Sequence, residues 1–232
     1  MCIRMKIILV NDDGIRSKRL EFAEKILNTY GEVYVVAPEE QQSGKSTSIT
    51  IGEFGYRKIS DNKYAVKGTP ADCVSFSLFG LGIEPDLIVS GINEGYNIGV
   101  DILYSGTVGA AFQANYFQKK AIAFSGDFQG DSIVKKHFQS TLDFILDNDL
   151  PSEDHILNVN FPADDFVEPK GTMLTRQYFR RAKLVPKMEN NVFRHDKLYY
   201  EEDVPKDTDV FSHLNGYISI SKIRLNNLSW NE

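Results

Sequence analysis

Two patterns of apolar and polar positions alternate along the chain up to about residue 162. Short, nearly continuous apolar runs are typical of strands covered on both faces, and longer stretches with apolar residues every three or four positions are typical of helices. The first pattern predicts strands at 6–11, 33–37, 86–90, 121–125 and 155–161. The second predicts helices at 18–29, 70–79, 107–118 and 131–146. This alternation predicts an α/β fold, doubly wound around a mainly parallel, Rossmann-like sheet.

Two regions depart from the alternation. The segments 49–51, 54–59 and 64–66 have the composition of strands, and the last two are spaced as a hairpin. Beyond residue 162, strand-like pieces at 172–175, 192–194, 197–200 and 217–223 surround a short helical segment at 209–214. We therefore expect a single domain, 1–232, with an α/β core at 1–162 and a β-rich C-terminal extension at 163–232. The extension would be an oligomerisation arm with a returning segment, because long hairpins often pair with another subunit.

Composition narrows the class of protein. The chain has 232 residues, 42% hydrophobic and 25% charged, enough to bury a sizeable core. Its formal net charge of −6 argues against a DNA-binding protein, which needs many Lys and Arg contacts to phosphates. No apolar run approaches the roughly 20 residues of a membrane span, and the first residues lack the apolar region of a secretion signal. We therefore expect a cytoplasmic protein with no membrane anchor.

The cysteines and one basic cluster add little to this picture. Cys2 and Cys73 are too few for a disulfide framework and lack the spacing of a metal site, so we expect reduced thiols. The cluster at 176–187 includes Tyr178 and Phe179 and is typical of a solvated surface. Alternatively, it could guide an anionic ligand that carries a base.

Two adjacent carboxylates follow the first predicted strand directly. Asp12 and Asp13 stand before Gly14, at the edge where open α/β sheets bind ligands. One carboxylate could simply cap the next helix while the other faces solvent. A bound divalent cation is the alternative, because two neighbouring carboxylates need a counter-charge.

Three other loops at the same edge offer polar groups. Ser43 and Gly44 follow the second strand, and the segment 90–99, with three glycines and two asparagines, follows the strand at 86–90. Residues 104–107 precede a helix, where backbone N–H groups and the helix dipole favour an anion such as phosphate. Each loop alone is explained by turn chemistry or a helix cap. Because carboxyl ends of parallel strands meet at one edge, we expect the four loops to converge on one site.

Several spaced motifs carry a family resemblance. They are Val10-Asn11-Asp12-Asp13-Gly14, Ala37-Pro38 with Ser43-Gly44 and Ser46, Val66 with Gly68-Thr69-Pro70 and Asp72-Cys73, Ser90-Gly91-Ile92-Asn93, Tyr104-Ser105-Gly106-Thr107-Val108, and Asn158-Val159-Asn160-Phe161-Pro162. In this order they resemble the SurE family, the survival-protein nucleotidases, over about residues 5–162. The segment 15–19 departs from the family pattern, because it lacks the expected proline-glycine step.

The resemblance implies a divalent-metal-dependent phosphomonoesterase of the 5′-nucleotidase type. It would hydrolyse nucleoside monophosphates to nucleoside and phosphate, with metal-activated water as the nucleophile. One Mg²⁺ or Mn²⁺ per subunit would be bound by Asp12, Asp13, Ser43 and Asn93, and the two aspartates would be catalytic. The positions that match phosphate contacts in the family are Asn97, Ser105, Gly106 and Thr107. Family members are dimers or tetramers with an exchanged C-terminal arm, which implies a homodimer or homotetramer here.

Two other functions would use similar residues. A receiver-like phospho-acceptor domain also has paired acids after its first strand, but it needs an aspartate at the end of the strand 86–90, where this chain has Ser90 and Gly91. A nucleotide-binding regulatory protein without hydrolase activity would share all four loops. Dehydrogenases of the dinucleotide-binding class and Ser/His/Asp hydrolases require motifs that the chain lacks. Metal-dependent phosphate release that a chelator stops would separate the enzyme from the regulator.

Overall fold

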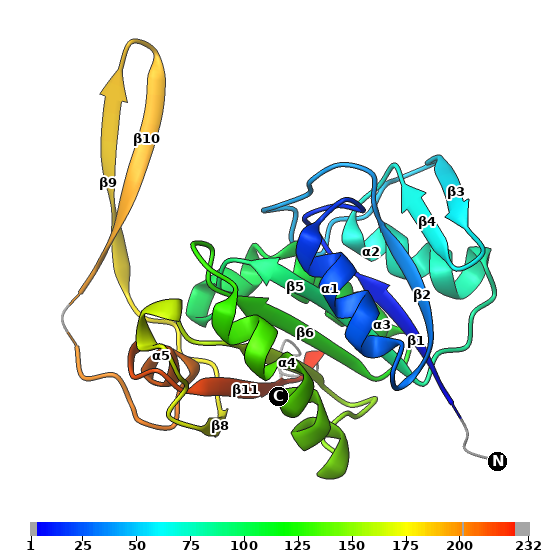
Figure 1. Ribbon diagram of the computed structural model, residues 1–232. Coiled ribbons are helices and arrows are strands. Elements are labelled where there is room, and N and C mark those ends of the chain that lie inside the picture. The colour runs from blue at the N-terminus through cyan, green and yellow to red at the C-terminus, as the bar shows by residue number, and fades with distance from the viewer. Residues whose placement is uncertain (1–3, 201, 226–232) are drawn as a thin grey trace, which may run out of the picture.

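One nine-stranded sheet runs through the structure (Figure 1). The computed structural model describes residues 4–200 and 202–225. The order of strands across the sheet is β3-β4-β2-β1-β5-β6-β7-β11-β8. These strands are β1 (Met5–Val10), β2 (Gly31–Pro38), β3 (Tyr56–Ser60), β4 (Lys63–Val66), β5 (Leu87–Glu94), β6 (Ala121–Gly126), β7 (Ile156–Asn160), β8 (Thr172–Thr175) and β11 (Ile218–Ile223).

The central strands of this sheet are parallel, and five α-helices in the described part of the chain accompany them. Strands β4, β2, β1, β5, β6 and β7 pair in parallel, whereas β3 and β11 join the sheet by antiparallel pairing. The helices are α1 (Lys18–Leu27), α2 (Pro70–Ser75), α3 (Gly106–Tyr116), α4 (Ser132–Asp147) and α5 (Asp209–Leu214). The predicted doubly wound, mainly parallel α/β fold is therefore confirmed.

Each central strand buries both of its faces. Along β1, Ile7 and Leu9 pack in the layer formed with α1 and α4, whereas Ile8 and Val10 pack in the layer formed with α2 and α3. All four side chains are fully buried. Because successive side chains of a strand point to opposite faces, a strand between two helical layers needs apolar residues at every position. This explains the continuous apolar run at the start of the chain.

Strand β1 has a parallel neighbour on each of its two edges. Strand β2 pairs with one edge of β1, and β5 pairs with the other edge, with Val10 opposite Ser90. Ligands in such folds bind outside the carboxyl ends of the strands, where the connections diverge. The residues that follow Val10 and Ser90 therefore lie at the expected ligand site.

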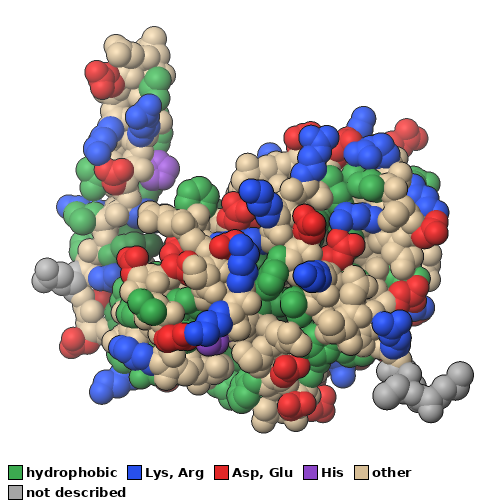
Figure 2. Space-filling view, viewed as in Figure 1, with side chains coloured by type: hydrophobic (Ala, Val, Ile, Leu, Met, Phe, Trp, Pro, Cys, Tyr) green, Lys and Arg blue, Asp and Glu red, His purple; other side chains and the backbone are tan. Residues whose placement is uncertain are grey.

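The C-terminal extension has two parts. Strands β8 and β11 continue the main sheet, with β11 antiparallel to β7. Strands β9 (Ala182–Glu189) and β10 (Val192–Tyr199) form a separate antiparallel hairpin that projects from the body of the molecule (Figure 1). Hydrophobic and charged side chains are interspersed along this hairpin (Figure 2). Among the described residues, no helix combines the length and apolar character needed to cross a bilayer.

Several predicted elements have different bounds in the structure. The segment 49–51 is not a strand, because Thr50 donates its backbone N–H and its hydroxyl to the carboxylate of Asp72. The predicted helix at 70–79 is α-helical only to Ser75 and continues as a π-helix, Phe76–Gly80. Strand β5 continues to Glu94, and a 3₁₀-helix at Gly99–Leu103 follows the glycine-rich loop.

The extension differs most from its prediction. The pieces predicted at 192–194 and 197–200 are one strand, β10, and its partner β9 overlaps the basic cluster at 176–187, whose residues in β9 are mostly exposed. The helix α5 has the predicted bounds. Cys73 is a buried free thiol, as predicted, whereas Cys2 lies outside the described residues.

Asp209, the first residue of α5, joins the extension to the core. Its carboxylate is fully buried and accepts hydrogen bonds from the backbone N–H groups of Gly99 (2.6 Å), Val210 (2.9 Å) and Tyr178 (3.0 Å). Burial raises the pKa of Asp209, and these hydrogen bonds oppose the rise. One side chain therefore fixes three separate segments to each other.

Replacing Asp209 should destabilise the fold much more than replacing a nearby exposed aspartate. Asp209→Ala leaves three N–H groups without this acceptor, two of them in buried hydrogen bonds, and we expect the free energy of unfolding to fall by about 3 kcal/mol. The measurement is urea unfolding at fixed protein concentration. Asp207→Ala is the matched control, because Asp207 pairs with Arg176 at the exposed surface (2.7 Å) and such pairs contribute little. Equal effects of the two substitutions would contradict the role assigned to Asp209.

Candidate functional site

The paired aspartates lie in a rigid turn after β1. Asn11 is buried, its Nδ2 donates to the carbonyl of Gly14 (3.0 Å), and its Oδ1 accepts from the N–H of Gly14 (3.2 Å). Gly14 has a φ of +97°, in the region that favours glycine. The side chain of Asn11 thus closes the turn that presents Asp12 and Asp13.

Asp12 is held against the N-terminus of α3. Its side chain is nearly buried, and its Oδ1 accepts from the hydroxyl of Thr107 (2.6 Å). Ser105 caps this helix by accepting from the N–H of Val108 (3.0 Å). A Cβ atom at Gly106 would lie 3.0 Å from the Cβ of Asp12, so glycine allows the helix to approach the carboxylate this closely.

Asp13 connects the first turn to the loop after β5. Its Oδ2 accepts from the backbone N–H of Glu94 (3.2 Å). The neighbouring Asn93 is half-buried, and its Nδ2 donates to the carbonyl of Gly95 (2.9 Å). This orientation leaves Oδ1 of Asn93 as its remaining acceptor, the atom type that a cation would use.

The loop after β2 also reaches this turn. The N–H of Gln42 donates to the backbone carbonyl of Asp12 (2.7 Å), which places the adjacent Ser43 near the aspartates. The side chain of Ser43 is exposed and accepts from Nε2 of Gln41 (3.1 Å). Farther along, Ser46 donates its N–H to the carbonyl of Tyr104 (3.0 Å). All four predicted loops therefore come together, as the sequence predicted.

Burial dominates the electrostatics of the two carboxylates. It raises the pKa of Asp12, and hydrogen bonds from the hydroxyl and backbone of Thr107 oppose that rise. Burial also raises the pKa of Asp13 to about 6, and the neighbouring negative charge of Asp12 adds to the effect. Two adjacent carboxylates in this environment are poorly compensated, and a cation between them would relieve the cost.

The donor atoms at this turn are suited to a hard divalent cation. Within residues 4–200 and 202–225, no three or more His, Cys, Asp or Glu side chains form a group that could hold a metal ion. A site here would therefore combine the two carboxylates with neutral oxygens of an amide and a hydroxyl. Oxygen ligands of this mixed kind are those that Mg²⁺ and Mn²⁺ prefer.

Arg19 is a site residue that none of the sequence motifs includes. Its side chain is buried, only 5% exposed. The guanidinium donates to the backbone carbonyls of Asn93 (2.8 Å), Gly130 (2.7 Å) and Asp127. Its positive charge also partly opposes the rise in the pKa of Asp13 that burial causes. Arg19, which lies in α1, therefore connects the loop after β5 to the loop after β6. The only sequence signal was the departure from the family pattern at 15–19.

Asn97 has a different position from the other predicted phosphate contacts. It is buried, and its Nδ2 donates to the hydroxyl of Ser125 (2.7 Å). Its backbone N–H donates to Oδ1 of Asn160 (2.8 Å), and its carbonyl accepts from Asn158 (2.7 Å). These bonds fix the glycine-rich loop to β6 and β7. Direct contact between Asn97 and phosphate stays a prediction.

Comparison with known proteins gives consistent matches over nearly the whole chain. The family model described as Survival protein SurE matches residues 7–184. A protein named 5′-nucleotidase SurE from Legionella pneumophila is 37% identical, over 95% of this chain and 91% of its own. A protein of the same name from Acinetobacter baylyi is also 37% identical, over 95% and 94%. The crystal structure of a SurE protein from Aquifex aeolicus matches with a TM-score of 0.83 and 34% identity, covering 97% of this chain and 95% of the other.

Removing the charge and hydrogen bonds of Arg19 should loosen the site. In Arg19→Met, three backbone carbonyls lose their donor, and we expect the free energy of unfolding to fall by about 2 kcal/mol and the affinity for Mn²⁺ to weaken. Urea unfolding and calorimetric titration with Mn²⁺ measure these effects. Arg16→Met is the control, because Arg16 is exposed three residues earlier. An Arg19 variant with unchanged Mn²⁺ affinity would show that Arg19 does not position the site.

When a chelator keeps divalent cations away from the protein, its stability should depend on the protonation of Asp13. Its folded pKa of about 6 lies above the ordinary value of 3.8. Its protonation therefore stabilises the fold fully below the lower value, and this contribution is lost as the pH rises through the higher one. In EDTA, we expect the midpoint temperature of thermal unfolding to decrease as the pH rises from the lower of these two pKa values to the higher. In Asp13→Asn this decrease should be smaller. Asp61→Asn, at an exposed turn, serves as the control. An unchanged slope in Asp13→Asn would contradict the assignment.

Proposed function

Because the chain belongs to the SurE family, we propose that it is a 5′-nucleotidase that hydrolyses nucleoside monophosphates with the help of a divalent cation. One observation carries the proposal beyond family membership: the buried carboxylate of Asp12 and the half-buried carboxylate of Asp13 lie next to the loop after β5 and the N-terminus of α3, where β1 and β5 end. The site therefore has oxygen atoms that can bind a cation next to groups that can bind an anion. Both are needed to bind and cleave a phosphate ester.

One Mg²⁺ or Mn²⁺ per subunit is proposed to bind to Asp12, Asp13, Ser43 and Asn93. When bound, such an ion polarises the phosphoryl group and makes water a better nucleophile at neutral pH. The protein residues supply the framework for this chemistry. Thr107 fixes the carboxylate of Asp12, and Arg19 fixes the loop that carries Asn93.

Phosphate is proposed to bind at the start of α3. Ser105, Gly106 and Thr107 form the first turn of this helix, where the dipole and free N–H groups favour negative charge. The hydroxyl of Thr107 already donates to Asp12, so its contribution to phosphate binding would come from the backbone. The Asn97 side chain would support the opposite wall through Ser125.

Asp13 is the carboxylate suited to orient the attacking water. It is less buried than Asp12, and its Oδ2 already accepts one hydrogen bond from Glu94. The water oxygen forms a bond to phosphorus, the ester bond breaks, and the nucleoside leaves with a proton on its oxygen. The products are a nucleoside and inorganic phosphate.

The hairpin β9–β10 is proposed to be an oligomerisation arm of a homodimer or homotetramer. Its strands are almost entirely exposed, and they carry large apolar side chains at Leu184, Met188, Phe193 and Leu198. A two-stranded ribbon cannot bury these side chains by itself. A second copy of the chain would cover them. The cytoplasmic location expected from the sequence stays a prediction.

Loss of one carboxylate should abolish the activity. We expect Asp12→Asn to lower kcat for a nucleoside monophosphate with saturating Mn²⁺ by at least about a hundred-fold, because a charged ligand and its bond to Thr107 are weakened. Release of inorganic phosphate is the measurement, and EDTA should stop it in the parent protein. Asp61→Asn should retain full activity, since Asp61 is exposed at the turn after β3.

Two results would contradict the proposal. Activity of Asp12→Asn within a few-fold of the parent would remove this aspartate from the mechanism. If the protein binds a nucleotide but releases no phosphate with any of the divalent cations tested, a nucleotide-binding regulatory function is favoured instead.

A further inference from the structure

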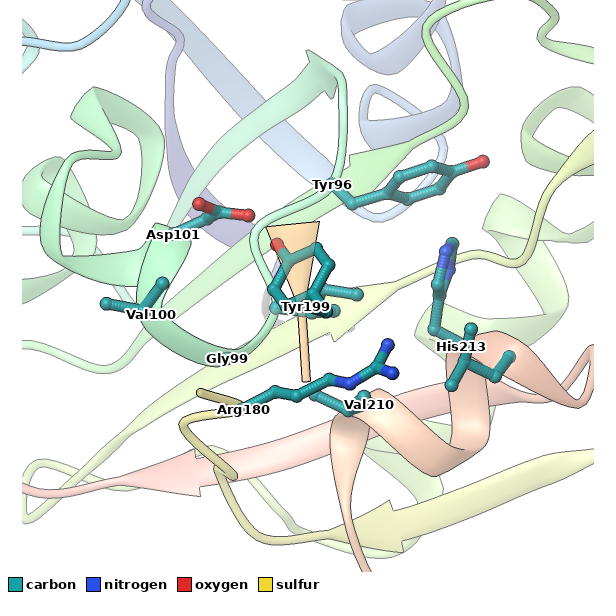
Figure 3. Close-up of a pocket in the computed structure, with 10 residues that line it drawn as sticks. Tyr96, Gly99, Val100, Asp101, Arg180, Tyr199, Val210 and His213 are labelled. Atoms are coloured by element: carbon teal, nitrogen blue, oxygen red, sulfur yellow. The ribbon is translucent and has the colours of Figure 1, made fainter. Parts of the chain in front are cut away.

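A cavity of about 480 Å³ lies beside the glycine-rich loop (Figure 3). Neither Asp12 nor Asp13 is among the residues that line it. Tyr96 and His213 form one end, and Val100 and Asp101 lie at the other end. Residues of the hairpin base, among them Tyr199, complete the wall. The volume is within the range of cavities that bind small organic ligands, about 300–1,000 Å³.

The cavity is within reach of the proposed phosphate site. Tyr96 follows Asn93 by three residues, and three residues of extended chain span at most about 10 Å. The intervening loop is fixed at both ends, by Arg19 at the carbonyl of Asn93 and by Asn160 at the N–H of Asn97. A molecule with its phosphate at the carboxylates could therefore extend along this loop into the cavity.

The walls of the cavity are aromatic and nearly neutral. The rings of Tyr96 and His213 are 4.2 Å apart between centroids, and the guanidinium of Arg180 lies 4.9 Å from the ring centroid of Tyr199. Arg180 faces Glu202 at 4.0 Å. Burial lowers the pKa of His213, which keeps its imidazole neutral. These walls favour a flat, uncharged group over a second phosphate.

Three residues that line this cavity have a buried polar atom without a hydrogen bond. Among the described residues, these atoms are the hydroxyl of Tyr96, Nδ1 of His213 and Nε of Arg180. Unpaired buried polar atoms are costly, and a ligand is one way to satisfy them. A heterocycle with ring nitrogens and exocyclic polar groups offers both donors and acceptors at its edge.

The hairpin holds its side of the cavity in place through a charged contact. Lys197 of β10 donates to Oδ1 of Asp101, at 2.5 Å. Asp101 belongs to the 3₁₀-helix that follows the glycine-rich loop. The wall that carries Tyr199 is therefore connected to the same loop that leads back to the carboxylates.

We propose that this cavity binds the nucleoside part of the substrate, with the base against Tyr199 and Tyr96 and the phosphate at Asp12 and Asp13. The proposal rests on the proposed nucleotidase function and adds the recognition of the base. It makes these aromatic residues determinants of specificity for nucleotides over simple sugar phosphates. They would not be catalytic residues, because they lie away from the reacting atoms.

The experiment compares AMP with ribose 5-phosphate, which has the same phosphate ester but no base. In Tyr199→Ala we expect KM for AMP to rise about ten-fold, the effect of losing one base-stacking contact, with kcat and the hydrolysis of ribose 5-phosphate unchanged. Val100→Trp, which fills the opposite end of the cavity, should have the same selective effect. Tyr200→Ala is the matched control, since the neighbouring Tyr200 is exposed and does not line the cavity.

The outcomes separate this proposal from the one it rests on. If the parent protein hydrolyses both substrates and the two variants leave KM for AMP unchanged, the cavity does not bind the nucleoside. If the two variants impair the hydrolysis of AMP and of ribose 5-phosphate equally, the cavity affects only the shape of the site, and the proposal is also wrong. If the parent releases no phosphate from either substrate, the nucleotidase proposal fails. Adenosine binding by calorimetry then still tests the cavity, and binding that Tyr199→Ala does not weaken overturns it.

Discussion

The paired negative charges of the buried Asp12 and the half-buried Asp13, at the end of β1, are the constraint that shapes the rest of the site. The surrounding structure compensates this charge only in part. Thr107 donates a hydroxyl to one carboxylate, and a backbone N–H of Glu94 reaches the other. Arg19 adds a positive charge but uses its donors on backbone carbonyls. Every loop that approaches the turn therefore brings donors, and the remaining deficit of positive charge matches a divalent cation.

The central fold was predictable because its signals are local. A strand buried on both faces has to be apolar at every position, so β1 is visible from five residues of sequence. The convergence of the loops at Asp12, Asn93 and Thr107 followed from topology, because parallel strands end at one edge of the sheet. The caps were also predictable: Thr69 forms a capping box with Asp72, three residues away.

The features that the sequence did not reveal depend on contacts between distant residues. Arg19 is separated by 74 residues from Asn93, and Asp209 by 110 residues from Gly99. An arginine or an aspartate is not predicted to be buried from its residue type, since an isolated charged side chain is usually exposed. The strand predicted at 49–51 was wrong for the same reason, because Thr50 bonds to a side chain 22 residues away. Strand β9 has no buried apolar face, so no hydrophobic pattern marks it.

The base of the hairpin β9–β10 forms a wall of the cavity, while its tip lies far out in solvent (Figure 1). Tyr199 lines the cavity, and Lys197 donates to Asp101 in the 3₁₀-helix that follows the glycine-rich loop. A partner that prefers one position of the ribbon and a ligand that prefers the same position strengthen each other's binding by the same factor. If a second copy of the chain covers the ribbon as proposed, its contacts there would be coupled in this way to the cavity at the base.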